Sequence, residues 1–206
     1  MVISTTELLN LYKDYKVPAM KIKHEIEKGK YIYLNRGLYE TDKNVPGYLL
    51  AGYIKSPSYL SFEYALSYYG LIPEFVYVYT SATTCRRHTY YYENKFGRYS
   101  YQDIPKTAFG YDVLYYEADG YSYMIASKEK AICDYLAIRE PLKNKKQLIS
   151  FLFDSLRIDY DLFMELDFKR MMDLCNLYKR GNLYLLKKVL KGFVEQTKKF
   201  FSRNNW

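Results

Sequence analysis

Residues 17–41, VPAMKIKHEIEKGKYIYLNRGLYET, carry the pattern that decides the N-terminal fold. The first half predicts a helix over residues 17–29. Pro18 suits the first turn of a helix, because the amide hydrogen that proline lacks would have no partner there. Gly29 provides the left-handed residue at which helices commonly end. The expected core contacts of this helix are Met20, Ile22 and Ile26.

The second half of the same stretch predicts a β-hairpin over residues 31–41. Asn35-Arg36-Gly37 interrupts the strand pattern as a tight turn, since glycine tolerates a positive φ. A further helix is expected just before the stretch, over residues 4–16, with Ser4 or Thr5 as its N-cap and Glu7 near its first turn. Two helices followed by a hairpin are the outline of a winged helix-turn-helix, and equally of any small unit of this composition.

In a winged helix-turn-helix the second helix enters the major groove of DNA and the hairpin contacts phosphates. The candidate DNA contacts are therefore cationic side chains on the helix, beside it and at the hairpin tip. The alternative is an ordinary solvated helical face and an ordinary surface arginine. The candidates are Lys21, Lys23, His24, Lys30 and Arg36.

Turn-forming residues are frequent in residues 42–57, which predict a junction between a unit of residues 1–45 and a larger unit of residues 46–206. The larger unit is expected to be a mixed β-sheet with helices, followed by a helical C-terminal part. Together with the N-terminal unit, this predicts the fold class α+β.

The expected helices of the sheet part are residues 61–69, capped by Ser61 and ended by Gly70, and residues 127–138, capped by Ser127. The expected strands are residues 76–83, a pair within 86–104, and a hairpin over 112–126 that turns at Asp119-Gly120.

Three helices are expected after Pro141, over residues 145–156, 160–178 and 182–201, and the last is amphipathic. Most of the formal charge of +8 lies in this part. Residues 139–206 carry 15 basic and 8 acidic side chains, whereas residues 46–138 carry 8 and 9. Positive surface favours polyanions, although a solvated helical face is the simpler interpretation.

Composition limits the cellular context. The three cysteines, Cys85, Cys133 and Cys175, are widely spaced and form no CxxC pair, which is typical of reduced thiols rather than of a disulfide framework or a zinc site. No apolar run approaches the length of a membrane span, and none near the start resembles a signal peptide. We therefore expect a cytoplasmic protein that does not bind a membrane.

The sequence carries little that is typical of a catalytic or cofactor-binding site. His24 and His88 lie in different expected units, and neither has cysteine or carboxylate neighbours at metal-ligand spacing, so no metal is expected. The glycine-rich nucleotide loops and the GxSxG nucleophile motif are absent. A metal-dependent nuclease would need a Glu-x-Lys after an acidic residue; Asp112 and the Glu117–Asp119 stretch are the nearest candidates, but no lysine follows. The sequence therefore predicts no enzyme, no cofactor and no small-molecule substrate.

Several segments, taken together, resemble the AbiEi-type antitoxin family. Residues 29–39 are similar to the wing that ends that family's N-terminal module. YLSFEYALSYYGLIPE (59–74), the Thr-Ser-x-x-Thr of residues 80–84, Phe-Gly at 109–110 and IASKEKAICDYL (125–136) are similar in order and spacing to its second domain. The likeness covers roughly residues 20–140.

This resemblance implies an antitoxin and transcriptional autorepressor of a type IV toxin–antitoxin system of the abortive-infection type, active in phage defence. The N-terminal unit would bind operator double-stranded DNA, and the second would counter a nucleotidyltransferase toxin, directly or indirectly. Only about 16 residues precede the expected recognition helix, so the winged helix would be abbreviated. Two alternatives stay open: an antitoxin or interaction module whose DNA binding has decayed, and a nuclease-like enzyme.

Overall fold

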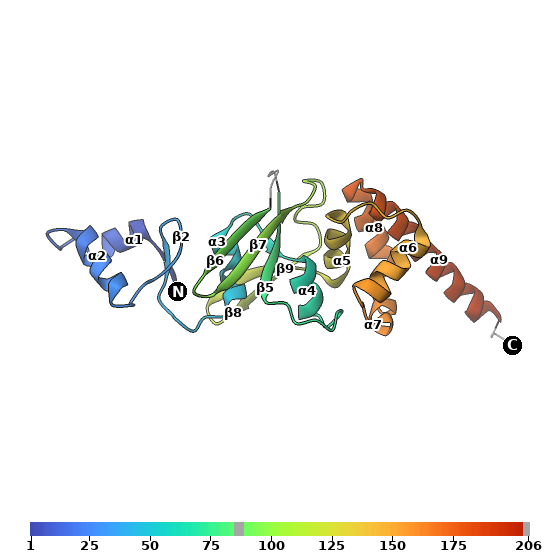
Figure 1. The fold of residues 1–206 in the computed structure, drawn as a ribbon, viewed down its shortest axis with the longest axis horizontal. Coiled ribbons are helices and arrows are strands. Elements are labelled where there is room, and N and C mark those ends of the chain that lie inside the picture. Colours follow the sequence, from blue (N-terminus) through green and yellow to red (C-terminus); the bar gives the residue numbers. More distant parts are fainter. Residues whose placement is uncertain (85–88, 204–206) are drawn as a thin grey trace.

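The computed structural model describes residues 1–84 and 89–203, with side chains as far as residue 196. Its N-terminal part is a small unit in which two helices pack on a three-stranded antiparallel sheet of order β1-β3-β2 (Figure 1). The elements are β1 (Val2–Ser4), α1 (Thr5–Leu11), α2 (Pro18–Glu27), β2 (Ile32–Asn35) and β3 (Leu38–Glu40).

Local sequence signals account for most of this unit. Ser4 and Glu7 form a capping box at the start of α1: the Ser4 hydroxyl accepts from the Glu7 N–H at 3.2 Å, and the Glu7 carboxylate accepts from the Ser4 N–H at 2.7 Å. Pro18 is in the first turn of α2, and Gly29 has a φ of +76° just beyond its end. These expectations are confirmed. Strand β1 was not expected, because three residues show no alternation that distinguishes a strand.

Each face of the small sheet is covered by a different part of the protein. Ile3 and Tyr39 pack with the two helices around a cluster of Leu8, Tyr12, Ile22 and Tyr31. Val2 and Leu38, their neighbours along the strands, pack instead against the main core, as does the fully buried Leu34. This alternation follows from the two-residue period of a strand. Met20, expected in the core, is 71% exposed, and Glu25 is buried on α2 with Ile22; the expectation for Met20 is wrong.

The larger unit is built on a mixed sheet which, within the described residues, has six strands. Its strand order is β6-β7-β5-β4-β9-β8, with β5–β7 and β4–β9 parallel and the other pairs antiparallel. The expected mixed sheet is confirmed. The strands are β4 (Tyr59–Leu60), β5 (Val78–Thr83), β6 (Tyr90–Asn94), β7 (Gly97–Asp103), β8 (Val113–Ala118) and β9 (Tyr121–Ala126).

Helices cover the sheet and form the C-terminal end of the molecule, where α9 extends past its neighbours (Figure 1). The expected helix over 160–178 is two helices, because Asp167 caps a new one by accepting from the Arg170 N–H at 2.9 Å. The segments are η1 (Gly47–Leu50), α3 (Ala51–Ile54), α4 (Phe62–Tyr68), α5 (Lys128–Ala137), α6 (Lys145–Ser150), the π-helical η2 (Phe151–Ser155), α7 (Tyr160–Met164), α8 (Phe168–Tyr178) and α9 (Gly181–Arg203).

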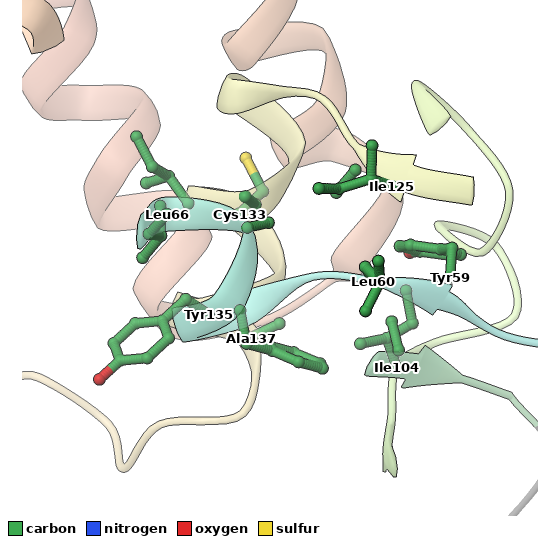
Figure 2. Close-up of a cluster of buried hydrophobic side chains, with 14 of the residues drawn as sticks. Tyr59, Leu60, Leu66, Ile104, Ile125, Cys133, Tyr135 and Ala137 are labelled. Atoms are coloured by element: carbon green, nitrogen blue, oxygen red, sulfur yellow. The ribbon is translucent and has the colours of Figure 1, made fainter. Parts of the chain in front are cut away.

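The main core lies where α4 and α5 pack on the middle of the sheet. Figure 2 shows Leu60 of β4, Ile125 of β9, Leu66 of α4 and Cys133 of α5 meeting there. All four are fully or almost fully buried, and the same core continues into α8 and α9. Because β4 pairs with both β5 and β9, this short strand joins the two halves of the sheet beneath the helices.

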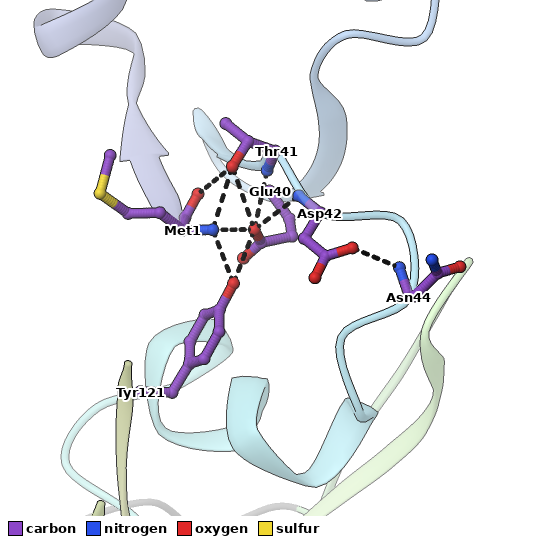
Figure 3. A network of polar contacts seen from close by, with 6 residues as sticks. All are labelled: Met1, Glu40, Thr41, Asp42, Asn44 and Tyr121. Atoms are coloured by element: carbon purple, nitrogen blue, oxygen red, sulfur yellow. Dashed lines mark hydrogen bonds and ion pairs between the residues drawn. The ribbon is translucent and has the colours of Figure 1, made fainter. Parts of the chain in front are cut away.

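A polar network joins the two units (Figure 3). The Glu40 carboxylate, at the end of β3, accepts hydrogen bonds from the Tyr121 hydroxyl at 2.8 Å, from the Asp42 N–H at 2.9 Å and from the amino group of Met1. Burial opposes the charge on Glu40, but these hydrogen bonds outweigh it and lower the pKa of the carboxyl group. At the turn end of the hairpin, the Asn35 amide donates to the Ile54 carbonyl at 2.9 Å. The hairpin is therefore fixed to the larger unit near both of its ends.

Candidate nucleic-acid interface

The expected recognition helix, α2, has one buried and one exposed face. Ile22 and Glu25 point inward, whereas Lys23 and His24 are exposed. Residues three and four apart share a face of a helix, so the buried pair and the exposed pair fall on opposite sides. In the described part of the chain the structure gives neither the Lys23 nor the His24 side chain a hydrogen bond or an ion pair. These two groups are therefore available to a ligand.

Lys21 is engaged inside the unit. Its Nζ lies 2.7 Å from Glu25 Oε1 and 5.2 Å from the centre of the Tyr15 ring. The hydrogen bond between Lys21 and Glu25 lowers the pKa of Glu25 and raises that of Lys21. The opposite charge of each partner adds to the shift of the other. The pair lies one helical turn apart, the spacing that favours such contacts. One of the three expected contacts on this helix is thereby paired within the helix.

Lys30 is held from the other side. Its Nζ donates to the Tyr12 hydroxyl at 3.1 Å and lies 3.9 Å from Glu25 Oε2. Tyr12 also shares a hydrogen bond of 3.0 Å with Tyr31, and this bond is the main reason that the pKa of Tyr12 is lowered. The two lysines thus converge on Glu25 and on a pair of tyrosine hydroxyls. The structure gives them an internal role, and their contact with DNA stays a prediction.

Arg36 occupies the hairpin tip, as expected, with a φ of +39° followed by +78° at Gly37. Positive φ at both turn residues is the geometry that two-residue hairpins need. The turn does not stand free in solvent on all sides. Arg36 lines a hollow of about 190 Å³ together with Ser56 and Tyr92 of the larger unit. Its backbone N–H donates to the Tyr33 hydroxyl at 2.9 Å.

The five candidate contacts therefore occupy three places: Lys21 and Lys30 around Glu25, Lys23 and His24 on the exposed face of α2, and Arg36 at the hairpin tip. Sequence reasoning placed all five on the N-terminal unit but could not separate them. The separating signal is Glu25, which lies four residues after Lys21 and five before Lys30, a spacing that permits ion pairing on a helix and its end.

The most concentrated buried charge in the described residues lies in the larger unit, and sequence reasoning missed it. Lys130 and Asp134 of α5 are both fully buried, with Nζ and Oδ1 2.7 Å apart. Asp134 also accepts from the hydroxyls of Tyr178 at 2.7 Å, Ser61 at 2.8 Å and Tyr59 at 3.0 Å. A buried ion pair is tolerated only when its remaining hydrogen-bonding capacity is satisfied in this way.

This cluster connects three elements rather than binding a substrate. Ser61 precedes α4, Tyr178 ends α8, and the ion pair belongs to α5. Burial raises the pKa of the Tyr178 hydroxyl well above its ordinary value, and the nearby Asp134 charge adds to the effect. With no exposed atom on either charged side chain, a substrate has no access to them. Ser61 is the N-cap residue of α4, as expected, but its hydroxyl donates to Asp134 and makes no capping hydrogen bond.

The carboxylates considered for a nuclease lie apart. Asp112 precedes β8 and is bound by the Ser127 hydroxyl at 2.6 Å and by the Arg170 guanidinium. Glu117, within β8, lies five residues further along the chain, roughly 16 Å away at the usual rise of a strand. Asp119 sits in the β8–β9 turn with a φ of +52°, confirming the expected hairpin. Among the described residues, no group of three or more histidine, cysteine and acidic side chains is placed to hold a metal ion.

The cysteine and histidine expectations can be followed only in part. Cys133 and Cys175 are unpaired, buried thiols, and burial raises the pKa of Cys133 well above its ordinary value. Such thiols pack as small apolar groups. Cys85 and His88 lie outside the described residues.

Comparison with known proteins leaves the family open. No protein-family model matches the chain, and no curated protein matches it. In the described part of the chain, every helix is too short or too polar to cross a lipid bilayer.

Proposed function

We propose that this chain is a DNA-binding autorepressor and antitoxin of the abortive-infection type, with α2 as its DNA-reading helix. One observation carries the DNA-binding half: α2 lies at the far end of the molecule from the C-terminal helices (Figure 1), with Lys23 and His24 exposed and without partners in the described residues. The helix is supported by a hydrophobic cluster of its own, so its outer face is free to enter a groove.

The arrangement departs from a winged helix with a free wing in one respect. The hairpin, which would be the wing, is covered by the larger unit on the face that carries Leu34 and Leu38. DNA contact would therefore depend on the exposed face of α2 more than on the hairpin, and the affinity would come mainly from phosphate contacts.

The antitoxin half rests on the resemblance of residues 59–136 to the second domain of that family. Its role would be to oppose a nucleotidyltransferase toxin in the cytoplasm without chemistry of its own. The polar residues of those segments support this role, because they have a structural task. Lys130, Asp134 and Ser61 hold α5 to the start of α4 at the sheet. The resembling motif at 125–136 would then preserve a shape that acts on other macromolecules.

A mobility-shift titration of the full-length chain on the labelled DNA upstream of its own gene tests the first half. The double variant Lys23→Ala/His24→Ala should weaken the shift at least tenfold, since each lost phosphate contact costs on the order of 1 kcal/mol. Lys106→Ala, an exposed lysine in the larger unit, should bind as the wild type does. Absence of any shift at low salt would remove the repressor function.

The second candidate is an interaction module that has lost DNA binding, and the ion pair of Lys21 with Glu25, which Lys30 also approaches, favours it. The two candidates separate in cells that carry the adjacent toxin gene. If Lys23→Glu/His24→Glu protects these cells and the wild-type protein does not shift the upstream DNA, the module is correct. If the wild type shifts the DNA, and the variant loses the shift but still protects the cells, the repressor–antitoxin is correct.

A further inference from the structure

A groove runs between α3 and the β8–β9 hairpin. It lies at the β8 edge of the sheet, and β6 forms the other edge. It consists of two joined hollows of about 430 and 370 Å³, which share Tyr53, Tyr115 and Ser122 in their walls. The sheet register brings these wall residues together: Tyr115 lies opposite Met124, and Glu117 lies opposite Ser122. All four side chains therefore share one face of the hairpin.

Aromatic rings form the walls of the groove. Tyr115 is 60% exposed, although a tyrosine ring gains from burial. Tyr53, from α3, stands edge-on to the Tyr121 ring with their centres 6.4 Å apart. Ser56 and Ser122 also line the walls and add hydroxyl groups to them. Exposed ring faces of this kind attract cations through the negative charge above the ring.

Charge in the groove has one sign. Glu117 and Asp119 line the second hollow, and the Tyr115 hydroxyl donates to Glu117 Oε1 at 2.8 Å. Among the described residues that line the two hollows there is no lysine, arginine or histidine. The chain as a whole carries +8, so the groove differs in sign from the protein around it. This favours a cationic ligand and opposes phosphates.

The strand beside the groove is an edge of the sheet. β8 is last in the strand order and pairs only with β9 among the described strands. The outward backbone groups of such a strand can pair with an added extended segment, while pockets beside the strand select its alternate side chains. A small free cation would use the rings and the carboxylate but not this backbone edge.

We propose that the β8 edge and the adjoining groove bind an extended segment of another protein, and that a lysine or arginine side chain of that segment lies against Tyr53 and Tyr115 and pairs with Glu117. The segment adds to the sheet as a further strand. The groove selects a basic side chain at alternate positions. This interaction is independent of DNA binding by α2, because none of the groove residues belongs to the N-terminal helices.

The other edge of the sheet provides a matched control. On β6, Tyr91 and Glu93 have the same spacing as Tyr115 and Glu117, and Tyr91 is 80% exposed. There the carboxylate is already paired, with Arg98 Nε 3.2 Å from Glu93 Oε1. Tyr-x-Glu on an edge strand is thus present twice, once with a neutralising arginine and once without.

The test uses the full-length chain and a fluorescent peptide, Thr-Lys-Val-Arg-Val-Lys-Thr with both ends blocked, followed by anisotropy. The alternation places its three basic side chains on one face. We expect saturable binding, weakened about five- to tenfold by Glu117→Gln and by Tyr115→Ala, the change that loss of an ion pair or a cation–π contact at a partly exposed site produces. Glu93→Gln and Tyr91→Ala should leave the affinity unchanged.

Three outcomes overturn the proposal. They are equal binding of a peptide with glutamate in place of the basic residues, equal weakening by the β6 and β8 variants, and no binding at millimolar peptide. Tetramethylammonium is the second probe: if it displaces the peptide completely at concentrations comparable with the peptide's own Kd, the site takes a free cation and the strand-addition part of the proposal is wrong. Amide shifts confined to β8 and α3 in the peptide complex support it.

Discussion

Lys130 Nζ lies 2.7 Å from Asp134 Oδ1 in a part of the core where neither side chain reaches solvent. Removing one partner of such a pair leaves the other charge buried and uncompensated. We expect Lys130→Met to lower the free energy of unfolding by about 3–5 kcal/mol. Urea unfolding followed by circular dichroism measures this change.

The control for this prediction is Lys128→Met, two residues earlier on the same helix and partly exposed. It should change the stability by no more than about 0.5 kcal/mol. The double variant Lys130→Met/Asp134→Asn should recover part of the lost stability, since the uncompensated charge is then gone. Wild-type stability in Lys130→Met would show that the pair is not buried as the structure has it.

Gly47 predicts an effect of backbone packing. A Cβ at this position would lie 2.3 Å from the Phe96 carbonyl oxygen and 2.4 Å from the Tyr79 ring. Neither neighbour can withdraw freely, so Gly47→Ala should destabilise the protein by about 1–3 kcal/mol or more. Gly52→Ala, in α3, meets nothing within 4 Å and should be neutral or stabilising by up to about 1 kcal/mol. Equal melting temperatures for the two variants would contradict this prediction.

Local signals in the sequence predict the parts of the fold that local physics determines. The Asp119-Gly120 turn, the Ser127 cap and the Pro18 start of α2 are each fixed by a few neighbouring residues. The winged helix-turn-helix identity is not fixed in this way. It depends on how the hairpin, α1 and α2 meet the rest of the chain, and here one face of the hairpin packs on the larger unit.

Long-range partners account for what the sequence could not predict. Strand β4 has two residues, and only its pairing with β5 and β9 makes it a strand. The hydroxyl of Ser61 has a local use as a cap, yet the buried Asp134, distant in sequence, takes it instead. For the candidate site the same limit applies: residue type suggested Lys21 as a phosphate contact, whereas the fold places it against Glu25 and Tyr15.

A pH dependence follows from Glu25. The hydrogen bond from Lys21 holds the pKa of Glu25 below its ordinary value. A lowered folded-state pKa means that the stabilisation is present at neutral pH and is lost as the pH falls below about 4.3 and through the lowered pKa. Amide-exchange protection of α2 should therefore decline on acidification, and Glu25→Gln should show less of this decline. Glu7 has a lowered pKa as well, so the informative quantity is the difference between wild type and variant. Identical curves for the two proteins would refute the role given to Glu25.

The two lysines on α2 should separate stability from DNA affinity. Lys21 is bound to Glu25, so Lys21→Ala should reduce the protection of α2 amides while leaving the salt dependence of DNA binding nearly unchanged. Lys23 is exposed on the other face. Lys23→Ala should keep the wild-type protection but reduce the log–log slope of affinity against salt by about 0.9, the value for one lost phosphate contact. Titrations at several salt concentrations, with exchange measured on the same samples, compare the two. If Lys21→Ala lowers the slope as much as Lys23→Ala does, the buried side of α2 faces the DNA and the orientation proposed for this helix is wrong.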